Sequence, residues 1–212
     1  MTVKKSVLGI AVVAALSSAS LMAYEKGDMM LRVGAAGVYP TGDSGNIDAL
    51  GSDAKVEADD AWSLGISAAY MLTDNIGVGL LGSYPFTHDI QAKGSISGLG
   101  KVAEATQLPP TLTLQYYLNN DSAFTPFVGA GVNYTYFFDE KGKGALDGTT
   151  VDINDSWGYA LEAGVDYDIN DQWMVGAQVY YINIETRAHT AVGNFDVDVN
   201  PVAYLLTAGY KF

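Results

Sequence analysis

Cysteine is absent from this 212-residue chain, and histidine occurs only twice. Without cysteine the chain can form no disulfide framework, no thiolate metal site and no thiol nucleophile, although export to an oxidising compartment remains open to it. Basic residues are also scarce, because 11 lysines and arginines stand against 24 acidic residues and give a net charge of −13. Such a chain is a poor match for nucleic acid, which selects basic patches.

Long apolar runs are missing as well, since no segment reaches the roughly 20 apolar residues that a membrane helix needs. The first residues carry a shorter pattern in which Lys4 and Lys5 precede the apolar stretch 7–16, and small residues lead to Ala23. This layout predicts a cleavable signal peptide, residues 1–23, followed by a single domain, residues 24–212. Removing Lys4 and Lys5 changes the net charge from −13 to −15.

Apolar and polar residues alternate with a period of two in eight segments of the mature chain. This period is typical of a strand with one apolar face. The segments are 31–37, 62–70, 76–84, 112–118, 128–136, 157–167, 173–179 and 202–212. A membrane protein without a spanning helix must be a closed barrel, because lipid satisfies no backbone hydrogen bonds. The pattern predicts an all-β fold, an eight-stranded antiparallel transmembrane β-barrel.

The connections between these segments alternate in length. Short turns fall at 73–75, 119–122 and 170–171, whereas long polar segments fall at about 40–60, 87–107, 139–155 and 186–198. Short periplasmic turns and long extracellular loops are typical of outer-membrane barrels. A soluble lipocalin-like barrel has the same strand count but turns its apolar face inward.

Aromatic residues favour the membrane alternative. They gather at both ends of the strands, and Trp62 and Tyr70 on one strand would lie ~20 Å apart along the membrane normal. Two aromatic belts at this separation match the two interfaces of a bilayer. Tyr210 and the C-terminal Phe212 resemble the signal by which the barrel assembly machinery recognises its clients, although a last strand can simply end in an aromatic residue. We therefore expect an integral protein of the bacterial outer membrane, in contact with its lipid.

Several motifs point to no chemistry. The GxGxxG match at 77–82 lies inside one strand and lacks the following helix that dinucleotide binding needs. The segment from Asp166 lacks the glycine and glutamate of a calcium loop. His88 and His189 fall near long loops without metal spacing and are expected to be solvated, so no metal or cofactor is predicted. The acidic residues between 43 and 60 are interpreted as solvated surface, or alternatively as divalent-cation contacts with lipopolysaccharide phosphates.

Charged residues are more informative where the period-two alternation points their side chains into the barrel, a position that we call lumen parity. Arg32 alternates against Leu31 and Val33, so its side chain is predicted to point into the barrel. Glu162 and Asp166 share lumen parity on the sixth strand. Because a buried charge needs a partner, we expect Arg32 to pair with one or both of them in the periplasmic half. A stabilising plug on the periplasmic side is favoured over a direct role in transport.

Prolines mark one seam of the predicted wall. Pro85 lies near the outer end of the third strand, and Pro109 and Pro110 begin the fourth. Each proline removes a donor from the hydrogen-bond ladder. Two interpretations stay open: a lateral opening between strands three and four, or prolines that merely end the strands.

Five segments together resemble the outer membrane protein W (OmpW) family along nearly the whole mature chain. They are YMLTDNIGV at 70–78, LPPTL at 108–112, PFVGAGVNY at 126–134, DSWG at 155–158 and GVDY at 164–167. The resemblance implies a narrow, mostly hydrophobic lumen and passive uptake of small hydrophobic molecules, with lateral release into the bilayer. Alkane-uptake proteins belong to this family. By match to its motifs, Leu81 and Tyr180 should line the lumen, and their parity agrees.

Physical arguments support the same solute class, because eight strands leave room for side chains or one small ligand. Two other functions stay open. One is a structural or adhesive barrel with a filled lumen that acts through its extracellular loops. The other is a lipid-modifying enzyme using His88 or His189 with an acid or Ser83, which is disfavoured because no coherent acid, base and nucleophile set is visible.

Overall fold

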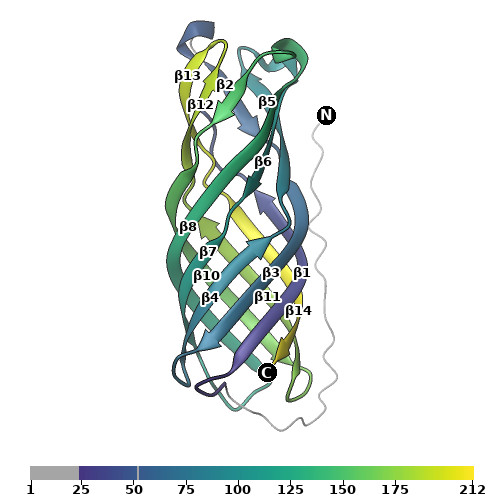
Figure 1. Cartoon of the computed structure of the whole chain (residues 1–212), viewed down its shortest axis with the longest axis vertical. Coiled ribbons are helices and arrows are strands. Elements are labelled where there is room, and N and C mark those ends of the chain that lie inside the picture. The colour runs from purple at the N-terminus through teal and green to yellow at the C-terminus, as the bar shows by residue number, and fades with distance from the viewer. Residues whose placement is uncertain (1–23, 52) are drawn as a thin grey trace, which may run out of the picture.

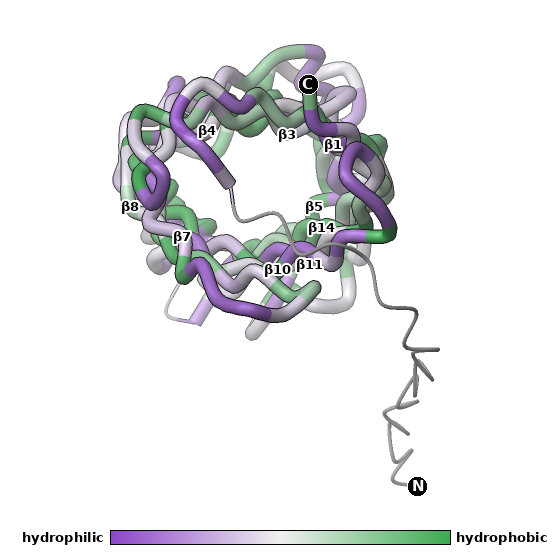
Figure 2. Tube along the Cα trace, turned by 90° about the horizontal axis from the view of Figure 1, so that it is seen from below, coloured by the Kyte–Doolittle hydropathy of each residue, from purple (hydrophilic) through white to green (hydrophobic). Residues whose placement is uncertain are grey.

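The barrel wall is a closed ring of antiparallel strands. The computed structural model describes residues 24–51 and 53–212, and the predicted signal peptide lies outside them. The ring follows the order β1 (Met29–Tyr39), β3 (Ala61–Met71), β4 (Ile76–Ser83), β7 (Thr111–Tyr117), β8 (Phe124–Gly142), β10 (Ser156–Asp168), β11 (Trp173–Ile182) and β14 (Val202–Lys211). β14 pairs back with β1 and closes the ring (Figures 1 and 2). The predicted all-β, eight-stranded antiparallel barrel is confirmed.

The apolar face of this wall points outward. Leu64, Leu80, Leu114 and Leu206 are exposed, whereas residues of opposite parity such as Thr113 are buried. An apolar exterior is the surface that lipid contacts, so the soluble-barrel alternative is wrong. Within residues 24–51 and 53–212, no helix is long and apolar enough to cross a membrane.

Exposed aromatic side chains lie at both ends of the apolar surface. Trp62, Tyr84 and Trp157 lie toward the end with the long connections, which we call the upper end. Tyr70, Tyr116 and Trp173 lie toward the end with the short turns and the C-terminus. We call this the lower end, and the C-terminus marks it in Figure 1. By the rule that outer-membrane barrels have short periplasmic turns, the lower end faces the periplasm.

The long connections are more regular than the loops predicted from the sequence. They contain strands β2 (Ala54–Ala58), β5 (Phe86–Gly94), β6 (Lys101–Leu108), β9 (Val151–Ile153), β12 (Glu185–Thr190) and β13 (Gly193–Asp198), and short 3-10 helices at Asp48–Leu50, Ser97–Leu99 and Gly144–Leu146. β6 pairs with the upper part of β8, so the wall continues above the ring (Figure 1). In this upper section the period-two pattern is inverted, because Phe86 and Ala92 point inward while Thr87 points outward into water.

Candidate functional site

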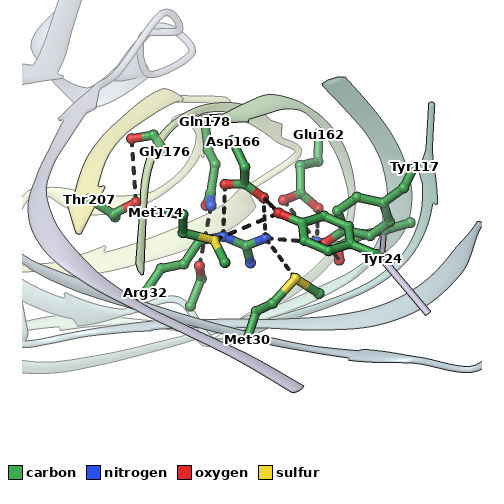
Figure 3. A network of polar contacts seen from close by, with 12 residues as sticks. Tyr24, Met30, Arg32, Tyr117, Glu162, Asp166, Met174, Gly176, Gln178 and Thr207 are labelled. Carbon is green, nitrogen blue, oxygen red and sulfur yellow. Dashed lines mark hydrogen bonds and ion pairs between the residues drawn. The ribbon is translucent and has the colours of Figure 1, made fainter. Parts of the chain in front are cut away.

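The lower lumen holds a network of buried polar side chains centred on Arg32 (Figure 3). Arg32 forms a bidentate ion pair with Asp166, in which Nη2 lies 2.5 Å from Oδ2 and Nε donates to Oδ1 at 3.0 Å. Their side chains are 1% and 0% exposed. Tyr24 donates its hydroxyl proton to Asp166 Oδ2 at 2.8 Å, and Arg32 Nη2 lies 3.4 Å from the Tyr117 hydroxyl. The charges are therefore paired and hydrogen-bonded, as a buried ion pair requires.

Glu162 belongs to the same network but does not contact Arg32 directly. Its carboxylate accepts hydrogen bonds from Thr113 Oγ1 at 2.8 Å and from Gln115 Nε2 at 2.9 and 3.0 Å. The Tyr180 hydroxyl donates to it at 2.5 Å. Tyr117 links the two groups through their partners, because its hydroxyl accepts from Arg32 Nη2 and donates to Gln115 Oε1 at 2.9 Å. Arg32, Glu162 and Asp166 are all buried on the lumen side of the wall, as the alternation predicts. Arg32 forms its ion pair with Asp166 and not with Glu162.

A buried apolar layer closes the lower lumen beneath this network. Its members come from the N-terminal segment and from five strands of the wall. They are Tyr24, Met30, Ala69, Met71, Tyr117, Phe127 and Met174. Tyr24 packs edge to face against Tyr117 at 5.1 Å between ring centroids. The N-terminal segment therefore occupies the periplasmic end of the lumen.

Leu81 and Tyr180 meet in an apolar cluster above the network. Both are buried, and they share this cluster with Phe86, Ile182, Ala203 and Leu205. Tyr180 marks the boundary between two kinds of interior, because its ring belongs to the apolar cluster while its hydroxyl binds Glu162. The structure thus places both residues in the lumen.

The wall is interrupted where Pro85, Pro109 and Pro110 lie, between the ends of the neighbouring strands. The β4–β7 ladder ends at the pair Leu81 and Thr111, and the β5–β6 ladder begins at the pair Phe86 and Gln107. Among the described residues, no ladder pair joins 82–85 to 108–110. We call this interruption the proline gap.

Each side of the proline gap is bonded to the strand behind it. On one side, Tyr84 donates its amide proton to Leu64 O at 2.8 Å, and Ser63 Oγ donates to Tyr84 O at 2.9 Å. On the other side, Asn133 Nδ2 donates to the carbonyl oxygens of Pro109 and Pro110, each at 3.2 Å. The backbone at the gap thus satisfies much of its hydrogen-bonding capacity without bonds across it.

A small apolar cavity lies behind the proline gap. Its volume is about 20 Å³, counted as the space open to the centre of a water-sized sphere. Leu81, Ser83, Phe86 and Pro109 line it from the gap side, and Ile182 and Leu205 from the lumen. Ser83 Oγ is buried and has no hydrogen-bond partner among the described residues.

A larger apolar cavity occupies the upper section. Its volume is about 80 Å³ in the same measure, and its lining includes Ile90, Val102, Phe137, Ala188 and Val197. Its polar lining includes His88 and Gln107. His88 was expected to be solvated, and this expectation is wrong, because the residue is 4% exposed on the inner face of β5. The sequence does carry a signal for this burial, because His88 alternates in step with the apolar residues Phe86 and Ile90. Burial lowers the pKa of His88.

The remaining predicted residues lie at the surface. Tyr210 packs against Trp173 and Phe212 with ring centroids 5.1 and 4.8 Å apart, at the lower end of the barrel. Their role in assembly stays a prediction. In the acidic segment, Asp43 pairs with Lys55 at 3.0 Å, and Glu57 pairs with Lys93 at 3.2 Å. His189 is half-buried on β12, where it pairs with Asn194 of β13.

A closed eight-stranded barrel with an apolar, aromatic-flanked exterior and short turns at one end has the architecture of a small bacterial outer-membrane protein. The chain belongs to the OmpW family, whose family model matches residues 25–212. This confirms the resemblance seen in the sequence and the location in the outer membrane.

The similarity to individual known proteins extends over most of the length of this chain and of each relative. The chain is 41% identical to outer membrane protein W of Vibrio cholerae serotype O1, over 99% of this chain and 100% of the relative. It is 32% identical to outer membrane protein AlkL of Ectopseudomonas oleovorans, over 89% and 84% of the two chains. Among solved structures, the crystal structure of OprG from Pseudomonas aeruginosa superposes with a TM-score of 0.82 at 38% identity, over 89% and 97% of the two chains.

Proposed function

We propose that this barrel takes up small apolar molecules from outside the cell and releases them sideways into the outer membrane through the proline gap. The observation that carries the proposal is the gap itself. The wall lacks ladder pairs between 82–85 and 108–110, where the two sides bond to β3 and β8 instead. Opening at this place breaks no ladder hydrogen bond, whereas opening elsewhere in lipid would leave backbone groups unpaired at a cost of several kcal/mol each.

The interior supports the same route. The larger cavity in the upper section, which we call the upper cavity, and the cavity behind the gap are both lined mainly by apolar side chains. Leu81 and Phe86 line the cavity behind the gap. Below the two cavities, Arg32, Asp166 and Glu162 are held in a hydrogen-bonded network that an apolar molecule could pass only by breaking bonds it cannot replace. This barrier makes the straight path into the periplasm harder than the sideways exit. We therefore propose that these three residues act as a plug on the periplasmic side.

A disulfide across the gap tests this route, because the native chain has no cysteine. Ser83 and Pro109 line one cavity from opposite sides of the gap, so S83C/P109C is the test pair. Cells of a Gram-negative strain lacking its own relative would express the variant and receive the apolar dye N-phenyl-1-naphthylamine, which fluoresces in membranes. Oxidation should lower the rate of dye entry by at least about tenfold, equivalent to ~1.4 kcal/mol in the barrier, and reduction should restore it.

The matched control is V78C/L114C, which crosses the same seam lower down, where the two residues are already ladder partners. Its oxidation should leave dye entry unchanged. Equal dye entry through the oxidised and reduced test pair, with the disulfide verified, would refute lateral release. Dye entry no faster than in cells without the barrel would refute the uptake function and favour a structural or adhesive barrel with a filled lumen.

A further inference from the structure

The upper cavity is lined mainly by apolar side chains, and two of its polar side chains are linked by a hydrogen bond. His88 and Gln107 are 4% and 2% exposed, and both line the cavity. Gln107 is the ladder partner of Phe86, so it belongs to the first pair above the proline gap. A molecule moving from the upper cavity to the gap would pass beside it.

The hydrogen bonds of His88 fix the orientation of the Gln107 amide. Nδ1 of His88 lies 2.7 Å from the Asp59 carbonyl oxygen, which can only accept, so Nδ1 carries the proton. In a neutral imidazole the other nitrogen is then an acceptor. The Gln107 atom 2.9 Å from Nε2 is therefore its amide nitrogen, which donates.

This orientation leaves the amide oxygen of Gln107 without a partner. Oε1 is buried and accepts no hydrogen bond among the described residues. Burying an acceptor without a donor is unfavourable, so a group that supplies the donor gains from binding here. Besides His88 and Gln107 itself, the polar side chains of the cavity lining are Thr186, Thr190 and Glu57, and the Glu57 carboxylate is paired with Lys93 at 3.2 Å.

We propose that the upper cavity binds apolar molecules that carry one hydrogen-bond donor, such as small phenols, and that Gln107 Oε1 accepts the donor. The inference rests on the proposed uptake function and narrows its substrate class. The size agrees, because a water needs roughly 10–15 Å³ in this measure and the cavity has about 80 Å³. A single aromatic ring with short substituents is therefore a suitable occupant.

Three ligands of nearly equal shape test the proposal. They are p-cresol, which donates a hydrogen bond, p-xylene, which has a methyl group in place of the hydroxyl, and 4-methylanisole, whose oxygen can only accept. Each would be titrated into the mature chain in lipid nanodiscs, with methyl signals of Ala103 and Ala188 in the cavity wall as the NMR readout. Affinities would be compared at equal ligand concentration in the lipid phase, because all three partition into it.

We expect p-cresol to bind about tenfold more tightly than p-xylene or 4-methylanisole, in line with one buried neutral hydrogen bond. Gln107→Leu alone would leave His88 Nε2 unpaired, so the test variant is H88F/Q107L. It should keep p-xylene binding and lose the preference for p-cresol. The control Val102→Ala changes the cavity wall but no polar group, so it should shift both affinities and keep their ratio.

Equal affinities of the wild-type chain for p-cresol and p-xylene would overturn the proposal. So would binding of 4-methylanisole as tight as that of p-cresol, because Oε1 would then not be the partner. No methyl shift with any of the ligands would overturn it as well. None of these outcomes depends on the dye-entry experiment, which tests the gap and not the cavity, so the two proposals can fail separately.

Discussion

The lower half of the lumen lies inside the eight-stranded ring, whereas most of the upper half lies inside the section that the long connections build above it, and the two halves are filled in opposite ways. The lower half holds an ion pair and a chain of hydrogen bonds from Tyr24 to Tyr180. The upper half is filled mainly by apolar side chains, which line the upper cavity and the cavity behind the gap. A polar network stabilises only when nearly every member is satisfied, so it demands close contacts. Apolar packing has no directional requirement, and a void costs only lost contacts.

The largest expected effect concerns the ion pair. Arg32→Met should destabilise the barrel by about 3–5 kcal/mol, because Asp166 would be left as a buried charge without its partner. Urea unfolding of the refolded chain in lipid vesicles would measure this loss.

The matched control is R32M/D166L, which removes both charges. It should recover most of the lost stability, since replacing a buried pair by apolar residues is often neutral or better. An equal loss in the single and double variants would mean that the ion pair itself, rather than the unpaired charge, stabilises the lower half.

A smaller effect is expected at the boundary between the halves. Tyr180→Phe keeps the ring in the apolar cluster and removes the hydrogen bond to Glu162. Hydrogen bonds to charged groups contribute about 1.5–3 kcal/mol, so unfolding stability should fall by that amount. Dye entry should stay at the wild-type rate, because the path above the network is unchanged. Slower dye entry would place the hydroxyl on the route of the solute.

The upper half should respond to pH through His88. Burial lowers its pKa, against the opposing influence of Asp60, Asp59 and Asp89. The unfolded chain therefore binds more protons as pH falls below about 6.5, the ordinary pKa of histidine. Stability that is full above this pH should be lost progressively as pH falls toward the lowered pKa.

Hydrogen exchange of the β5 and β6 amides would detect this loss as lower protection factors at pH 5 than at pH 7.5. His88→Phe removes the titrating group and should show no such difference. A pH-dependent loss of equal size in both proteins would assign the effect to other groups.

The smallest effect is expected beside the proline gap. Ser83→Ala removes a buried hydroxyl that has no partner among the described residues. Stability should rise slightly or stay unchanged, within about 1 kcal/mol. A clear loss of stability in urea unfolding would show that Ser83 forms a hydrogen bond in solution.

The sequence predicts the ring of strands well, because each spanning strand has lipid on one side and the alternation follows directly. It predicts the lumen parity of Arg32 for the same reason. It does not distinguish Asp166 from Glu162 as the partner, since both have lumen parity on β10 and the choice depends on how β1 and β10 are staggered across the lumen.

The upper section is harder to predict for a different reason. Above the aromatic belt the wall meets water instead of lipid, so its outward residues are polar, as at Thr87 and Asp89. The segment 87–107 then has the composition of a loop, although β5 and β6 occupy most of it. The interior position of His88 and the amide orientation of Gln107 depend on this hairpin and on Asp59, which is distant in sequence.

The proline gap has a consequence for how such a protein can diversify. Pro85 immediately precedes β5 and Pro109 immediately follows β6, so residues 86–108 form a hairpin with a proline at each junction to the ring. Since no ladder pair ties 82–85 to 108–110, the hairpin can change in length or sequence without altering the register of β4 against β7. Selection can therefore vary the part of the hairpin that lines the upper cavity, while the membrane-spanning ring keeps its strand pairing.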